Sequence, residues 1–414
     1  MIRILSSSAA RDLLTRKAIR LGEVEDVVRR IIDDVRTNGD RALLRYAREF
    51  DGFDRESFLV APAELAAAEA SLTAQLREAI HTASANIRSV AERQLPASSM
   101  AEASPGRRLG QIVRPLETVC AYVPAGRYPL ISTLLMTVIP AQVAGVQNIC
   151  VTTPKAVPEL LGTAALLGQG NVFLLGGAHA IAAFALGTET VPRADRMVGP
   201  GNVYVTAAKK LLAGEVGIDF VAGPTEILIV ARGGNPAWIA ADMLAQAEHD
   251  VEASAVLLTI SSSLAVAVAE EIETQLRDLP TVAVAREAIE RNGAIVVVDS
   301  MDQAMAFSNR YAPEHLSIDD AALLEKVEHA GGVFIGPHSP EAAGDYASGP
   351  NHVLPTSGAA RLRGGLSAAD FVKVISVQEL SADALREVSA TITTLARAEG
   401  LEAHARSVEA RFHE

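Results

Sequence analysis

Short apolar runs alternate with helical patterns from about residue 111 to residue 310, and this alternation most strongly constrains the fold. The apolar runs are TVCAYVP, NICVTTP, NVFLLGG, EILIVA, SAVLLTI and AIVVVD. Helical patterns occupy the intervals near 132–144 and 157–167, from Pro236 onward, and near 263–278 and 301–310. Strands that alternate with helices in this way predict βαβ units and mainly parallel sheets.

Two stretches share one order of elements. LLMTVIPAQVAGVQNICVTTP and ADMLAQAEHDVEASAVLLTIS both read as helix, short loop and apolar strand, which suggests two related α/β halves. Residues 22–95 have helical periodicity with a stop signal at Asn38-Gly39. The segment from about residue 378 also reads as helices.

Composition and charge exclude several classes of protein. The 414 residues are 49% hydrophobic and 21% charged, which excludes a disordered chain. The net charge of −13 comes without a Lys/Arg stripe, so we expect no nucleic-acid partner. The N-terminus lacks the apolar core of a signal peptide, and polar residues and Pro140 interrupt the apolar region 129–151. We therefore expect a cytoplasmic protein with no membrane span.

The two cysteines and the glycine loops limit the choice of cofactor site. Cys120 and Cys150 lie in apolar surroundings that favour buried, reduced thiols, and two cysteines cannot form a thiolate zinc site. Neither GxGxxG after a strand nor GxxxxGK[ST] is present. Glycine loops remain at strand ends, in VPAGRYP (123–129), LLGGAHAI (174–181) and VGPGNVYV (198–205). The helix after LLGG could present amides to an anion, although each glycine could equally serve only its turn.

Several polar residues are candidates for chemistry. Glu314 and His315 follow a proline in YAPEHL, which places them at the mouth of an element, where a surface turn is the alternative. Gln246 and His249 share a helix face and could bind a metal through nitrogen and oxygen, or simply face solvent. Asp345, in AAGDYASG, could cap a turn. His352 and His404 lie in polar, turn-rich segments.

Eight motifs, in order along the chain, resemble the histidinol dehydrogenase family. They are YVPAGRYPLISTLLM, GGAHAIAA, VGPGNVYV, AGPTEILI, AQAEHD, APEHL, GDYASGPNHVLPTSG and EGLEAHA. The resemblance implies an α/β fold of two related, incomplete Rossmann-like domains with parallel-rich sheets, a helical N-terminal region and a small helical C-terminal domain. The implied boundaries are an N-terminal segment 1–20, a discontinuous first domain 21–110 with 226–365, an NAD-binding second domain 111–225, and a C-terminal helical segment 366–414.

The resemblance also implies an activity and its residues. Members of the family are homodimers with one Zn²⁺ per subunit that oxidise L-histidinol through L-histidinal to L-histidine, using two NAD, in the final steps of histidine biosynthesis. Glu314 and His315 match the catalytic pair. The positions that match metal ligands are Gln246, His249, Asp345 and His404. The positions that match substrate contacts are Thr225, Gln246, His249, His315, Asp345, His352, Glu399 and His404, and those that match NAD contacts are Tyr122, His179 and Asn202.

The same resemblance assigns roles to these groups. His315 would remove the alcohol proton so that hydride can leave, and Glu314 would activate the water that adds to the aldehyde. Zinc would mainly orient the substrate through its amine and imidazole nitrogens. The family exchanges its C-terminal segment between subunits, so Glu399 and His404 would serve the neighbouring subunit's site.

Four positions depart from the family pattern, and two rival functions follow. His179 replaces a glutamine that contacts NAD, Thr225 a serine, Ala125 a glycine and Gln142 a lysine. One rival is a related NAD-dependent dehydrogenase of another small polar alcohol or diol. The other is a metal- or nucleotide-binding protein without turnover, which intact Glu314 and His315 disfavour.

Overall fold

The computed structural model describes residues 2–14, 21–125 and 130–412, so residues 126–129 of the predicted glycine loop lie outside the described residues. The chain divides into two compact units, Met1–Gln94 with Leu116–Phe371 and Leu95–Pro115 with Val372–Glu414. Within the described residues, the strands form two parallel sheets in the first unit and one antiparallel sheet in the second.

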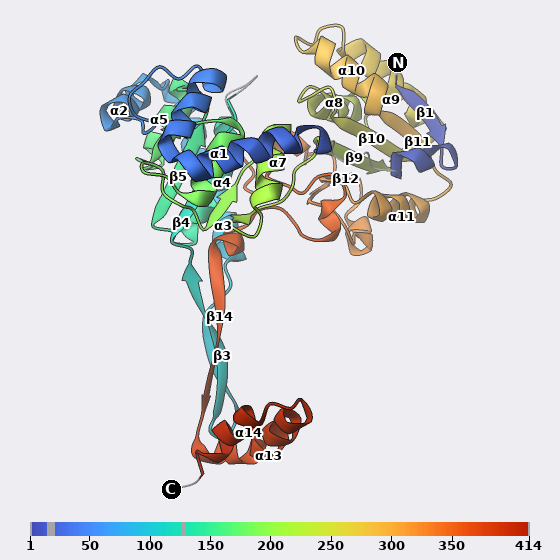
Figure 1. Cartoon of the computed structure of the whole chain (residues 1–414). Helices are drawn as coiled ribbons and strands as arrows, with labels where there is room; N and C mark the ends of the chain where they lie inside the picture. The colour runs from blue at the N-terminus through green and yellow to red at the C-terminus, as the bar shows by residue number, and fades with distance from the viewer. Residues whose placement is uncertain (1, 15–20, 126–129, 413–414) are drawn as a thin grey trace. The chain divides into compact units, whose positions relative to one another are not determined.

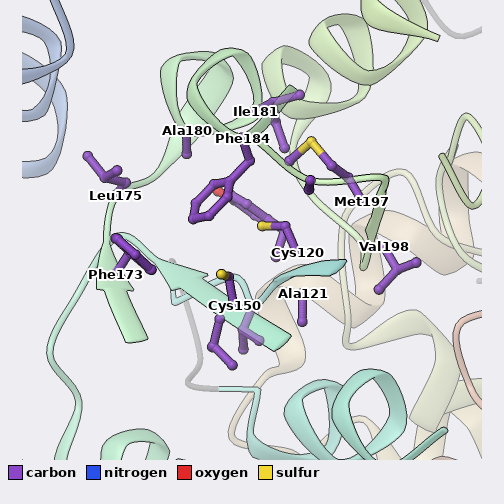
Figure 2. Packing of buried hydrophobic residues seen from close by; sticks show 14 of the residues in the cluster. Cys120, Ala121, Cys150, Phe173, Leu175, Ala180, Ile181, Phe184, Met197 and Val198 are labelled. Carbon is purple, nitrogen blue, oxygen red and sulfur yellow. The ribbon is translucent and has the colours of Figure 1, made fainter. Parts of the chain in front are cut away.

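One parallel sheet of the first unit has five strands in the order β6-β5-β4-β7-β8. Its strands are β4 (Thr118–Tyr122), β5 (Asn148–Thr153), β6 (Val172–Leu174), β7 (Arg196–Val198) and β8 (Gly217–Ile218). Every residue of β4 is buried, as expected for a strand covered on both faces, which needs a continuous apolar run. Figure 2 shows Phe184 packed among side chains of these strands, with its ring edge-on to that of Phe173 at 5.2 Å.

Two groups of helices pack on this five-stranded sheet: helices that precede it in the sequence and helices that lie between its strands. They are α1 (Gly22–Tyr46), α2 (Pro62–Ser71), α3 (Ala74–Gln94), α4 (Ile131–Val143), α5 (Pro158–Leu166), α6 (Gly177–Leu186) and α7 (Val203–Leu212), with the single π-turn η2 (Ala47–Asp51) after α1. Residues 22–94 therefore share a core with the sheet of residues 118–218, which differs from the predicted grouping of 21–110 with 226–365. The predicted domain boundaries themselves stay a prediction.

The stop signal at Asn38-Gly39 produces a kink inside α1 rather than an end. Gly39 has φ 52°, and the helix resumes after it. A Cβ at Gly39 would lie 2.3 Å from Oε2 of Glu189, and this same oxygen accepts the Asp40 N–H at 2.8 Å. The kink is thus held by a side chain from a distant loop, which local sequence does not reveal.

The second parallel sheet has six strands in the order β1-β11-β10-β9-β12-β13. Its strands are β1 (Arg3–Ser6), β9 (Glu226–Ala231), β10 (Ser254–Thr259), β11 (Ala294–Val297), β12 (His315–Ile318) and β13 (Gly332–Ile335). Alternate residues of β9 face opposite ways. Ile227 and Ile229 pack with α8 (Pro236–Ala247), α9 (Ser262–Gln275) and α10 (Val282–Asn292), whereas Leu228 and Val230 pack with α11 (Met301–Tyr311).

The two sheets repeat one topology. The order β6-β5-β4-β7-β8 corresponds to β11-β10-β9-β12-β13, and β1 is added at one edge of the larger sheet. In each sheet a helix, α4 or α8, connects the central strand to its first parallel neighbour. The prediction of two related α/β halves with parallel-rich sheets is confirmed.

The second unit contains the antiparallel sheet and two helices. Its elements are β2 (Ser99–Ser104), β3 (Arg107–Pro115), β14 (Val372–Leu380), α13 (Ala382–Ala398) and α14 (Glu402–Glu409). β3 and β14 run side by side in Figure 1 and pair over nine residues of each strand. The predicted helical segment 366–414 therefore also contains a strand, because VKVISVQEL has the β-branched residues that favour extended backbone.

Shorter elements complete the described chain. They are η1 (Ala9–Leu14), η3 (Ala321–Lys326), α12 (Glu341–Tyr346), η4 (Ala359–Arg361) and η5 (Ala368–Phe371). Among the described residues, none of the helices combines the length and the apolarity that crossing a membrane requires.

Candidate active site

The acid and the imidazole of YAPEHL lie at the amino edge of the six-stranded sheet. α11 ends where Ala312 adopts a left-handed conformation, with φ 51°, and β12 begins at His315. The register pairs His315 with Ile227 of β9. Thr225 and Glu226, at the start of β9, therefore lie beside Glu314 and His315, and the expected position at the mouth of an element is confirmed.

A directed chain of hydrogen bonds connects α8 to this pair. Gln246, fully buried near the end of α8, donates through Nε2 to Oγ1 of Thr225 at 2.8 Å. The Thr225 hydroxyl donates to Oε2 of Glu314 at 2.6 Å. The Glu226 N–H donates to the same carboxylate oxygen at 2.8 Å. Oε1 of Gln246 is buried without a hydrogen-bond partner among the described residues.

The environment of His315 fixes its tautomer. Nδ1 lies 3.1 Å from the backbone oxygen of Glu226, and a carbonyl can only accept, so Nδ1 carries a proton. Nε2 is buried and makes no hydrogen bond in the described part of the chain; Oδ1 of Asp345 is 3.6 Å away from it. Glu341, on α12 with Asp345, places Oε1 at 3.6 Å from Nδ1.

Burial and charge shift the pKa values of this cluster. Burial raises the pKa of Glu314 to about 7 and that of Glu341 to about 8, while the charge of His315 partly opposes both shifts. Burial alone would lower the pKa of His315, but the carboxylates of Glu341 and Glu314 outweigh it and raise that pKa to about 10. Several buried carboxyl groups thus surround one imidazole, whose charge compensates theirs.

Two further histidines lie near Asp345. Nδ1 of His352 is 2.8 Å from the backbone oxygen of Asp345, and Nε2 is 3.3 Å from Oγ1 of Thr133 on α4. α8 ends at Ala247, so His249 lies in the exposed turn after it and not on the helix face predicted for it and Gln246. Burial raises the pKa of Asp345, but the hydrogen bond and charge of His315, with smaller effects of His352 and His249, lower it overall. A cavity of about 300 Å³ opens beside Asp345 and His352, with Phe334 and Leu354 in its wall.

The residues predicted to contact NAD lie at the carboxyl edge of the five-stranded sheet. Tyr122 ends β4, His179 lies in the first turn of α6, and Asn202 caps α7 by accepting the N–H groups of Tyr204 and Val205. Gly199 has φ 109°, and a Cβ there would lie 2.2 Å from the backbone oxygen of Tyr122. Only glycine lets the VGPGN loop approach Tyr122 so closely.

The amides that were expected to face an anion at the start of α6 have acceptors within the protein. Gly176 N–H donates to Oδ2 of Asp51 at 2.9 Å, and Gly177 N–H donates to the Tyr122 hydroxyl at 3.2 Å. Nε2 of His179 also lies 2.9 Å from Oδ2 of Asp51, and this imidazole is only 1% exposed. An NAD contact by His179 stays a prediction.

Comparison with known proteins agrees with this geometry. The model of the family described as histidinol dehydrogenase matches residues 14–412. The chain belongs to the histidinol dehydrogenase family. It is 49% identical over 393 residues to the histidinol dehydrogenase of Thermus thermophilus, with 94% of each chain covered. The histidinol dehydrogenase of Methanothermobacter thermautotrophicus is 44% identical over 412 residues, with 97% of each chain covered.

A solved structure leads to the same family. The crystal structure of histidinol dehydrogenase from Elizabethkingia anophelis superposes with a TM-score of 0.95 at 36% identity, covering 99% of this chain and 98% of that one. The match therefore extends over both units of the chain rather than over a single domain.

Glu341 belongs to the buried cluster around His315, but none of the motifs shared with the histidinol dehydrogenase family predicted it. Its carboxylate is 4% exposed, and one oxygen each of Glu341 and Asp345 and a ring nitrogen of His315 all lie within 4.8 Å of one another. Among the described residues this group could hold a metal ion, and it shares only Asp345 with the predicted ligands. The four-residue spacing of Glu341 and Asp345, which places both on one helix face, was the available signal.

Two predicted site residues lie in the second unit. Glu399 is the C-cap of α13 and His404 lies in α14, and both are exposed. Their part in a histidinol dehydrogenase site stays a prediction.

Of the other departures from the family pattern, Gln142 has a structural explanation. It accepts a hydrogen bond from Arg88 at 3.0 Å and donates to the backbone oxygen of Leu167 at 2.7 Å, so it connects α3 with the end of α5.

Proposed function

We propose that this chain oxidises L-histidinol through L-histidinal to L-histidine, with two NAD consumed per substrate. The observation that carries the proposal is the buried pair of Glu314 and His315, in which the hydrogen bonds occupy one reactive atom of each group. Nδ1 of His315 is engaged by a backbone oxygen. Both hydrogen bonds that Glu314 accepts from described donors fall on Oε2. Nε2 and Oε1 are left for substrate and water.

His315 is the base of the first step. Hydride leaves a carbon readily only when the attached oxygen carries negative charge, so the alcohol proton must be removed. In the neutral imidazole Nδ1 holds the proton, so Nε2 is the atom that can accept the alcohol proton once the carboxylate charge that raises the pKa of His315 is offset. The Glu226 carbonyl fixes the ring for this transfer.

Glu314 is the base of the second step. The aldehyde can give up a second hydride only after water has added to it, and a carboxylate beside the carbonyl can activate that water. The pKa of Glu314, raised to about 7 by burial, suits proton transfer near neutral pH. Thr225 and the Glu226 amide hold Oε2, so Oε1 is the atom that would contact the water.

The donor set fits a zinc ion. Gln246 Oε1 is a buried, unpartnered oxygen. Asp345, whose pKa the charge of His249 helps to lower, offers an acidic oxygen and His249 a nitrogen, with no thiolate, as catalytic zinc sites accept. We assign Gln246, His249 and Asp345 as ligands, with His404 completing the set. When bound, zinc would hold the substrate nitrogens and offset the carboxylate charge that raises the pKa of His315.

Two further parts of the proposal concern NAD and the subunits. NAD would bind at the carboxyl edge of the five-stranded sheet, near Tyr122, His179 and Asn202, where α/β sheets usually bind nucleotides. We also propose a homodimer in which Glu399 and His404 enter the partner's site. The second unit supports this because it exposes large apolar side chains, including Leu109, Val374, Ile375 and Leu395, which a partner could cover.

The test is the stoichiometry of the zinc-loaded protein with L-histidinol and NAD. Two NADH per histidine, abolished by chelation and restored by zinc, would support the four-electron oxidation and its dependence on zinc. Absence of NADH despite full zinc occupancy and measurable NAD binding would reject histidinol as the substrate. A screen of small amino alcohols and diols would then test the alternative dehydrogenase, with Thr225 and His179 as the positions to revert to serine and glutamine.

A further inference from the structure

We propose that Thr225 is a positioning residue that fixes the amide orientation of Gln246, so that the amide oxygen, and not the amide nitrogen, faces the metal position. This inference rests on the proposed function, because it concerns the zinc ligands of that same site. It assigns to the Thr225 hydroxyl a task other than substrate contact.

The direction of the hydrogen bonds is set by chemistry. A side-chain amide nitrogen can only donate, so at 2.8 Å from Nε2 of Gln246 the Thr225 oxygen must accept. A hydroxyl has one proton, and with its oxygen already accepting, that proton is directed to Glu314 at 2.6 Å. Glu314 thus requires the Thr225 proton, and Thr225 consequently requires an N–H from Gln246.

The alternative amide orientation breaks this chain. If Gln246 rotated by half a turn, its oxygen would face the Thr225 hydroxyl, and the single hydroxyl proton could no longer serve both acceptors. Two acceptor oxygens would then confront each other inside a fully buried site, which is costly. The amide N–H₂ would also point toward the ligand position, where a cation requires a lone pair.

The observed orientation leaves the ligand atom free. Gln246 Oε1 is buried and without a partner in the described chain, while the nitrogen of the same amide is hydrogen-bonded. A buried acceptor left open in this way is expected where a ligand will occupy it. Outer hydrogen bonds of this kind commonly tune metal sites by about 10- to 100-fold in affinity.

The additional methyl of threonine, compared with the family's serine, fits this task. A β-branched side chain has fewer accessible χ1 rotamers than serine, so the hydroxyl is more firmly directed at Glu314. The replacement would therefore strengthen the positioning of Gln246.

The test measures the affinity of the protein for Zn²⁺ alone, by competition with a chromophoric chelator in the absence of substrate and NAD. Thr225→Val removes the hydroxyl at nearly constant volume and should weaken zinc binding at least about 10-fold. Thr225→Ser keeps the hydroxyl and should stay within about three-fold of the parent. Thermal unfolding of each variant shows whether it is folded.

A second background separates positioning from general damage. In Gln246→Glu, either rotation of the side chain presents an oxygen, so adding Thr225→Val should change zinc affinity less than two- to three-fold. If Thr225→Val weakens binding equally in both backgrounds, or in neither, the inference is overturned. It also fails if the parent binds no zinc.

The inference and the proposed function can fail separately. Loss of zinc affinity only in the Gln246 background, together with no oxidation of histidinol by the parent, supports the positioning role and rejects the substrate. If the parent oxidises histidinol and its Thr225→Val variant binds zinc normally, the proposed function is supported and the positioning role is rejected.

Discussion

Lys209 and Asp219 form an ion pair that is almost completely shielded from solvent, with side-chain exposures of 4% and 1%. Both partners also bind the same glycine. Lys209 Nζ donates to the Gly199 oxygen at 3.0 Å, and the Gly199 N–H donates to Oδ2 of Asp219 at 2.8 Å. The pair thereby fixes the loop that leads to Asn202, one of the residues expected to contact NAD.

Replacing Lys209 with methionine should destabilise the protein strongly, because Asp219 would remain buried without its counter-charge. We expect a loss of about 3–5 kcal/mol in the free energy of unfolding, measured by urea denaturation, and a rise in KM for NAD. Lys210→Met is the matched control, since Lys210 pairs with Glu25 at a side-chain exposure of 49% and should cost no more than about 1 kcal/mol. Equal losses of unfolding free energy in Lys209→Met and Lys210→Met would show that burial does not make the Lys209–Asp219 pair contribute more to stability than the exposed pair.

The residues proposed as catalytic and those proposed as zinc ligands should differ in the effects of their replacement. His315→Asn and Glu314→Gln are expected to lower turnover by about 10²- to 10⁴-fold while zinc content stays near one per subunit. His249→Asn is expected to lose zinc. Zinc content, from metal analysis, and turnover, from steady-state rates, are compared for the same preparation of each variant. Parental rates of histidinol oxidation in both catalytic-pair variants would refute the roles assigned to them.

Glu341→Gln should move the acid limb of the pH profile. The Glu341 carboxylate stabilises the imidazolium of His315 and so raises its pKa. Without that charge the pKa falls, and the neutral base persists to lower pH. We expect the acid limb of kcat in the zinc-loaded protein to shift down by about one pH unit. Glu325→Gln, at an exposed position, is the control, and an unshifted limb in Glu341→Gln would exclude this electrostatic role.

The proposed composite sites predict complementation between two inactive variants. A heterodimer of His315→Asn and His404→Asn subunits would contain one doubly altered site and one intact site. Purified through two different affinity tags, it should show about half of the parental activity. If each subunit supplied its own His404, the heterodimer would be as inactive as either parent variant.

The sequence predicted the main helices and strands and many residues of the candidate site. The prediction failed where residues far apart in the chain determine the local structure. The buried strands were readable because β4 and β9 are continuous apolar runs. Thr225, Gln246, Glu314, His315 and Asp345 could be named from motifs. Glu341 was missed because a single buried carboxylate four residues before Asp345 has no motif of its own.

Other features depended on long-range partners. The α6 amides find Asp51 and Tyr122 as acceptors, which no local pattern around LLGG could indicate. Likewise, the kink at Gly39 requires Glu189, which lies 150 residues along the chain. Hydrogen-bond direction in the Gln246, Thr225 and Glu314 chain became visible only once the three side chains were seen together.

The pairing of His315 with Ile227 also determines how this protein can change during evolution. Glu314 and His315 are neighbours in the chain, and both are held by the backbone of Glu226: its N–H donates to Oε2 of Glu314, and its oxygen binds Nδ1 of His315. Insertion or deletion of one residue between Ala312 and His315 would move at least one of these two groups away from its partner on Glu226. The segment can therefore diverge by substitution, but its length cannot drift as that of an ordinary loop does.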